Sequence, residues 1–140
     1  MDADLIRGPR KMMEKRILLA VNGTLMRGLK LNGNMVKAQA EFVREATTEA
    51  AYRCWSIDDD HPGMIKTLDK AKGAAIAVEV WSVPASQLAE LLISEPEGLC
   101  IGKVRLSDGS VVLGVLAEPW VVANQKEITQ YGGWRNFSNL

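Results

Sequence analysis

Residues 22–28 (Asn-Gly-Thr-Leu-Met-Arg-Gly) are the first part of the sequence whose residue types suit a binding site. They follow the apolar run 17–21, where a buried strand would open into a glycine-rich loop. Gly23 allows a ligand to approach the backbone, and successive amides of such a turn can hold a carboxylate or a developing oxyanion. Arg27 could add a guanidinium fork for a carboxylate. A plain turn between a strand and a loop is the alternative.

Three acidic residues are candidates for proton transfer or ligand binding. Glu95 and Glu97 follow a predicted helix, where acids are usually solvated. Beside the apolar residues 99–101, one of them could instead be partly desolvated, which would raise its pKa and suit a general base. Glu79 lies among apolar neighbours in a predicted strand, so it must reach water or form an ion pair. Its candidate partners are Arg53, Arg105 and Arg135.

The residue counts argue against metal and triad chemistry. The chain has one histidine, His61, and two cysteines, Cys54 and Cys100, without metal-ligand spacing or a Gly-x-Ser-x-Gly elbow. Residues 58–63 (Asp-Asp-Asp-His-Pro-Gly) are predicted to be a solvated acidic loop, because they lack the ligand periodicity of a calcium site. The cysteines are interpreted as buried, reduced and inert thiols. We therefore expect no metal and no cofactor.

The composition is typical of one soluble domain. The 140 residues balance 17 Lys+Arg against 17 Asp+Glu, and 47% of them are apolar. Zero net charge without a basic block argues against nucleic-acid binding. The longest apolar run is too short to cross a bilayer, which argues against a membrane partner. We expect a flexible N-terminal arm over residues 1–15, a single domain over residues 16–140 and a cytoplasmic location.

The elements that must position these residues follow no regular β-α-β order. Apolar or alternating runs predict strands at 17–21, 51–57 and 73–83, and a helix or helix-to-strand connection at 35–43. A short helix is predicted after Pro84. The remaining predicted elements are strands at 101–106 and 111–117 around an Asp-Gly turn, and an aromatic segment at 132–137 that packs back on the body. This order predicts an α+β fold around a curved antiparallel sheet or small barrel.

The loop at residues 22–28 resembles the Tyr-Gly-Ser/Thr-Leu loop of the γ-glutamylcyclotransferase-like superfamily, with asparagine in place of the tyrosine. Further motifs are similar, in their order and spacing, to the C-terminal domain of allophanate hydrolase. These motifs are Val78-Glu-Val-Trp81, Gly98-Leu-Cys-Ile-Gly-Lys-Val104, Leu106-Ser-Asp-Gly109, Gly114-Val-Leu-Ala-Glu118, Glu127-Ile-Thr129 and Gly132-Gly-Trp-Arg135. The resemblance covers residues 16–137.

This resemblance implies a small, mostly antiparallel β-barrel with short flanking helices and a cavity that opens at the glycine loop. It also implies that the amides of Gly23, Thr24 and Leu25, next to Asn22, bind a substrate carbonyl or carboxylate. In the cyclotransferases a glutamate of a Glu-Gly pair takes the proton from the substrate's α-amino group, and the nitrogen then attacks the γ-carbonyl. The matching glutamate is Glu97, with Glu95 as the near alternative.

Two functions follow as hypotheses. The first is an enzyme of cyclotransferase type that acts on a small amide or amino-acid derivative. The second is a non-catalytic module that binds a small carboxylate or pairs with a separate amidase; a homodimer is left open. In allophanate hydrolase, a histidine after a Leu-Asn pair is thought to assist decarboxylation. Here Leu31-Asn32 is followed by Gly33, which argues against that route.

Overall fold

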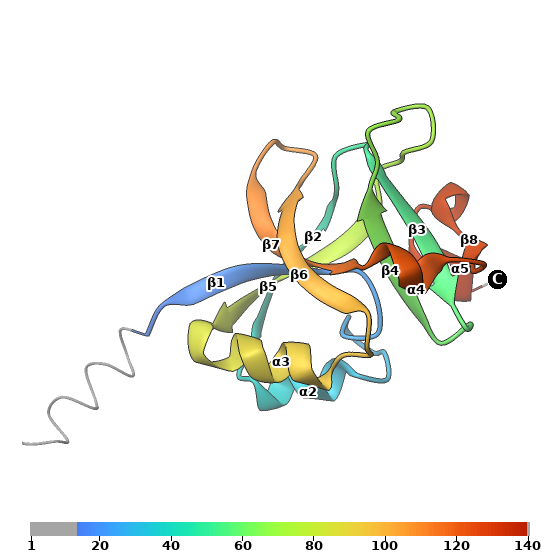
Figure 1. Ribbon diagram of the computed structural model, residues 1–140. Coiled ribbons are helices and arrows are strands. Elements are labelled where there is room, and N and C mark those ends of the chain that lie inside the picture. Colours follow the sequence, from blue (N-terminus) through green and yellow to red (C-terminus); the bar gives the residue numbers. More distant parts are fainter. Residues whose placement is uncertain (1–13, 140) are drawn as a thin grey trace, which may run out of the picture.

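A computed structural model describes residues 14–139 of the chain (Figure 1). Most of the expected N-terminal arm therefore lies outside the described residues. The described part contains two sheets. The five-stranded sheet has the order β2 (Glu41–Thr47), β5 (Ala77–Pro84), β1 (Arg16–Val21), β7 (Val111–Ala117) and β6 (Leu99–Arg105). The three-stranded sheet has the order β4 (His61–Lys66), β3 (Tyr52–Ile57) and β8 (Lys126–Glu127).

Short helices flank the two sheets. They are α2 (Asn32–Lys37), η1 (Ala85–Gln87), α3 (Leu88–Ser94), α4 (Pro119–Val122), η2 (Thr129–Tyr131) and α5 (Trp134–Ser138). Helices α2 and α3 lie side by side next to the five-stranded sheet, whereas α4 contacts β3 and β4 of the other sheet (Figure 1). Every strand pair is antiparallel except β1 with β7. The α+β class is confirmed, whereas the pairings of the described strands close no barrel, so the barrel stays a prediction.

The centre of the larger sheet consists of β1 and β5, as their apolar content predicts. Residues 19–21 of β1 are about 1% exposed, and β5 is buried on both faces over most of its length. Burial of both faces explains the continuous apolar runs in place of strict alternation. The end of β1 is therefore a rigid support for the loop that follows it.

The predicted loop at residues 58–63 is wrong in its second half, because β4 begins at His61. The turn contains only three aspartates, and the Asp60 N–H donates to the Ile57 carbonyl at 2.9 Å. Asp58 and Asp59 both have positive φ, as tight hairpin turns require. Pro62 is compatible with β4 because this strand is at an edge of its sheet. The lone histidine thus belongs to an ordered strand and not to a solvated loop.

Other local predictions are confirmed with small shifts. The segment 35–43 contains both expected parts, since α2 ends at Lys37 and β2 begins at Glu41. Helix α3 ends just before Glu95-Pro96, and the hairpin β6–β7 turns at residues 107–110. The aromatic C-terminal segment packs back on the body, since Trp134 is 7% exposed. No helix among the described residues is long and apolar enough to cross a membrane.

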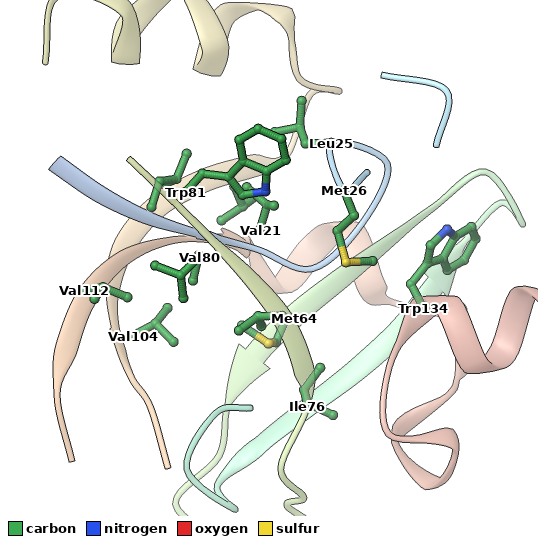
Figure 2. Packing of buried hydrophobic residues seen from close by; sticks show 14 of the residues in the cluster. Val21, Leu25, Met26, Met64, Ile76, Val80, Trp81, Val104, Val112 and Trp134 are labelled. Atoms are coloured by element: carbon green, nitrogen blue, oxygen red, sulfur yellow. The ribbon is translucent and has the colours of Figure 1, made fainter. Parts of the chain in front are cut away.

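One continuous core joins the two sheets. Figure 2 shows part of it, where side chains of β1, β4, β5 and the β6–β7 hairpin gather. Met64 of β4 and Ile76, just before β5, are both almost fully buried. Because β4 contributes to the same core as β1, the beginning of β4 is held next to the loop that leaves β1. This packing builds the pocket described next.

Candidate functional site

A small pocket forms where the loop after β1, the start of β4 and the end of α3 meet. Its lining residues are Val21, Asn22, Gly23, Thr24, Leu25, His61, Pro62, Glu95, Leu99 and Val115. The cavity has a volume of about 10 Å³, which is room for one water molecule. Four of the predicted binding residues and one of the two predicted general bases therefore lie around a single cavity.

The backbone carbonyls of loop residues 23–25 all accept hydrogen bonds. The Met26 N–H donates to the Gly23 carbonyl at 3.0 Å, and the Leu31 N–H donates to the Thr24 carbonyl at 3.0 Å. The Asn32 side chain donates to the Leu25 carbonyl at 2.8 Å. Within residues 14–139, none of the N–H groups of residues 23–25 donates a hydrogen bond. Unpaired N–H groups beside a cavity are suited to binding an anion.

Gly23 is required for a different reason than the one the sequence suggested. A Cβ atom at position 23 would lie 2.6 Å from the ring carbons of Pro62. Real Cβ contacts are not this short, so any side chain at position 23 would push β4 away from the loop. Pro62 thus occupies the space where a side chain at position 23 would lie, and this contact closes one side of the pocket.

Asn22 attaches the loop to the neighbouring strand. Its Nδ2 donates to the Val115 carbonyl of β7 at 2.8 Å, and the residue is buried. The parallel pairing of β1 with β7 stops at Ala20 and Gly114, and the Asn22 side chain continues the connection beyond it. Asn22 therefore lines the pocket while one side of its amide holds the loop in place.

Glu95 is the acid that faces the pocket. It caps the C-terminal end of α3 in an extended conformation and lines the cavity together with residues 22–25. Burial raises the pKa of its carboxyl to about 7, without any charged neighbour that contributes to the shift. No side-chain hydrogen bond to this carboxyl occurs in the described part of the chain. Glu97, the other predicted general base, is exposed and lies outside this lining.

Glu79 and Arg27 bind each other away from this pocket. Glu79 is 2% exposed and accepts hydrogen bonds from the Arg27 N–H at 2.9 Å and the Arg27 Nε at 3.1 Å. It also accepts from Trp81 Nε1 at 3.1 Å and Arg135 Nη2 at 3.2 Å. Arg135 is thus the partner among the three candidates. The carboxylate fixes the far end of the loop, and ligand binding by Glu79 or Arg27 stays a prediction.

His61 lines the pocket although its sequence context did not single it out as a site residue. The residue is 8% exposed, and its Nε2 is buried without a hydrogen-bond partner in the described residues. Nδ1 lies 2.8 Å from Asp60 Oδ2. Hydrogen bonds from Lys30 and His61 hold the pKa of Asp60 below its usual value.

Cys54 fits the interpretation of a buried thiol, whereas Cys100 is only half-buried. Cys54 is fully buried in β3, and burial raises the pKa of its thiol to about 12. Burial also raises the pKa of Cys100, with a further contribution from Glu118. Neither residue lines the pocket, so thiolate chemistry has no support at this site.

The fold places the chain in a known structural class. It is similar to a solved structure of a γ-glutamyl cyclotransferase, with a TM-score of 0.52 and 14% identity over 81% of this chain and 70% of that chain. This likeness shows a γ-glutamylcyclotransferase-like fold and nothing finer. The sequence model of the allophanate hydrolase C-terminal domain matches residues 17–139, so the chain belongs to that family.

Individual relatives agree with this assignment. A uropathogenic E. coli-specific protein is 56% identical, with a TM-score of 0.87 over 89% of this chain and 97% of that chain. The allophanate hydrolase of Kluyveromyces lactis is 27% identical, with a TM-score of 0.85 over 89% of this chain and 21% of that chain. A urea amidolyase of Lachancea kluyveri is 29% identical over 96% of this chain. This chain spans only 8% of the length of that amidolyase.

Proposed function

We propose that this chain is an enzyme that acts on a small amide or amino-acid derivative. Glu95 serves as the general base, and the N–H groups of Gly23, Thr24 and Leu25 hold a carboxylate or developing oxyanion. One observation supports the proposal: a half-buried carboxyl without a hydrogen-bond partner lines the same small cavity as loop residues 23–25, whose N–H groups donate no hydrogen bond within residues 14–139. A carboxyl whose pKa is raised to about 7 accepts a proton readily near neutral pH.

The dimensions of the cavity restrict which part of the substrate enters. A volume of about 10 Å³ accommodates one water-sized group, so a single oxygen of the reacting carbonyl or carboxylate occupies the cavity while the rest of the substrate lies outside it. In this arrangement Glu95 removes a proton from the attacking nitrogen or water, and negative charge develops on an oxygen held by the loop amides. The proposal favours Glu95 over Glu97 because Glu97 does not line the cavity.

The test is release of a lactam or ammonia from a panel of γ-glutamyl and ureido compounds. Glu95→Gln is expected to lower kcat/KM by a factor of about 100 to 10,000, which is the range for loss of a general base. Glu97→Gln tests the alternative assignment, and Glu90→Gln, at an exposed acid of the same helix, is the control. Full activity of Glu95→Gln would rule out Glu95 as the base.

A second candidate function is a non-catalytic partner of an amidase. It is favoured by the length comparison, because the matched urea amidolyase carries the similar segment as a small part of a much longer protein. This function predicts stabilisation by a small carboxylate without turnover, or co-elution with a separate amidase. It is checked by thermal shift with amino acids and ureido acids and by size-exclusion chromatography with candidate amidases. An unchanged melting temperature and elution volume throughout would contradict it.

A further inference from the structure

The three aspartates of the turn before β4 form hydrogen bonds with different partners, and one of them contacts the ring of His61. The Asp58 carboxylate bonds to Gln125 Nε2 at 3.0 Å, and Asp59 accepts from the Ser56 hydroxyl at 3.1 Å. Only Asp60 contacts the His61 ring. Lys30 donates to the other oxygen of the Asp60 carboxylate, and this bond secures its orientation and charge. The turn is therefore a built support for the imidazole ring.

The two ring nitrogens of His61 have different surroundings. Nδ1 donates to Asp60 whether the ring is neutral or protonated, because a carboxylate can only accept. In the neutral ring, Nε2 is consequently the nitrogen with a free lone pair. It is buried, it has no hydrogen-bond partner within residues 14–139, and its residue lines the cavity with Glu95 and the loop. An unpartnered buried nitrogen is costly unless a ligand or water completes it.

We propose that His61 is a second proton-transfer residue of this pocket, with Nε2 directed at the ligand and Asp60 as its positioning residue. This proposal rests on the proposed function, since it assigns His61 to the same reaction as Glu95. When the attacking nitrogen or water forms its bond to the carbonyl carbon, its proton goes to Glu95. When the bond from carbon to the leaving nitrogen breaks, that nitrogen receives the Nε2 proton of the imidazolium. Exchange with water then returns a proton from Glu95 to solvent and a proton from solvent to His61.

The single histidine allows a direct test by NMR. In protein labelled with ¹⁵N-histidine, the only imidazole nitrogens observed belong to His61. The probes are acetate, 5-oxoproline and hydantoic acid, each titrated into the intact chain. A bound probe is expected to shift the Nε2 resonance in this sample and the backbone amides of residues 23–25 in a uniformly ¹⁵N-labelled sample. It is also expected to slow carbethoxylation of His61 by diethyl pyrocarbonate.

Variants of the turn separate a proton-transfer role from a structural one. His61→Gln is expected to lower kcat by about 100-fold and to remove one limb of the pH–rate profile. Asp60→Asn is expected to change the ¹⁵N shifts that report the tautomer of the His61 ring, and to lower kcat by a smaller factor than His61→Gln does. Asp59→Asn is the matched control, because Asp59 bonds to Ser56 and asparagine tolerates positive φ. It should leave the Nε2 resonance unchanged.

The outcomes distinguish this proposal from the proposed function. If the probes shift the loop amides but not Nε2, His61 is outside the ligand site and the proposal fails, while the proposed function stands. If neither responds to any probe, the pocket binds none of these ligands and both fail. If Nε2 responds and His61→Gln loses activity while Glu95→Gln retains it, His61 is confirmed and the assignment of Glu95 fails. A His61→Gln variant with the wild-type rate and pH profile also overturns the proposal.

Discussion

Replacement of Glu79 by alanine is expected to lower the free energy of unfolding by about 3 kcal/mol, because each hydrogen bond to a charged group contributes about 1.5 to 3 kcal/mol. The carboxylate accepts hydrogen bonds from a loop N–H, an indole and two guanidinium groups. The guanidinium groups of Arg27 and Arg135 are partly exposed and can turn to water. The indole N–H of Trp81 is buried and would lose its acceptor. Loss of this acceptor, together with release of the loop, dominates the expected effect.

Urea denaturation of the wild type and the variant at neutral pH measures this difference. Glu45→Ala is the matched control, because Glu45 also pairs with Arg27, at 2.9 Å, but its side chain is 77% exposed. A surface ion pair contributes less than about 1 kcal/mol, so this control should change stability little. Equal effects of the two variants would show that burial of Glu79 does not determine its contribution.

The second large effect is a pH dependence of stability that belongs to Glu95. Its carboxyl has a pKa of about 7 in the folded protein, against an ordinary value of 4.5. As the pH rises from 4.5 towards 7, the unfolded chain releases this proton while the folded chain retains it. Stability is therefore lost with rising pH across this window, by about 2 kcal/mol for a half-buried group. Glu95→Gln removes the titration, so the variant should gain stability relative to the wild type between pH 5 and pH 8.

The measurement is the difference in unfolding free energy between wild type and Glu95→Gln at pH 5 and at pH 8. His61 is the other titratable group that lines the pocket, and it is present in both proteins, so the difference isolates Glu95. Glu97→Gln removes an exposed carboxyl two residues away and should keep the wild-type pH dependence. A difference between wild type and Glu95→Gln that is the same at both pH values would contradict burial as the cause of the raised pKa.

These effects bear on whether the pocket is a reaction site. Ionisable groups whose pKa is shifted by burial and that line a pocket are common at functional sites, and Glu95 has both features. Glu79 shows the opposite arrangement, a carboxylate with hydrogen bonds from every side. Both acids are shielded from solvent, yet only Glu95 leaves its oxygens free for a ligand.

Local patterns in the sequence determined most of the elements and the family. The apolar run before Asn22, the leucine spacing after Pro84 and the Asp-Gly turn each specify a structure within a few residues, because strand, helix and hairpin signals are local. The order of the motifs along the chain was sufficient for the resemblance to the allophanate hydrolase family, which the family match confirms. The glycine loop could also be identified as a candidate binding site from the sequence, because residues 22–25 form one contiguous motif.

Only the tertiary structure decided which distant residues face this loop. The family resemblance matched the general base to Glu97, with Glu95 as the near alternative, whereas the direction of the chain after α3 places only Glu95 at the cavity. His61 was assigned to a solvated turn because it follows three aspartates and precedes Pro62-Gly63. A strand can begin there because β4 lies at a sheet edge, where proline is tolerated, and packing of Pro62 against Gly23 brings His61 to the pocket. Such long-range contacts depend on the packing of the two sheets, which no local pattern encodes.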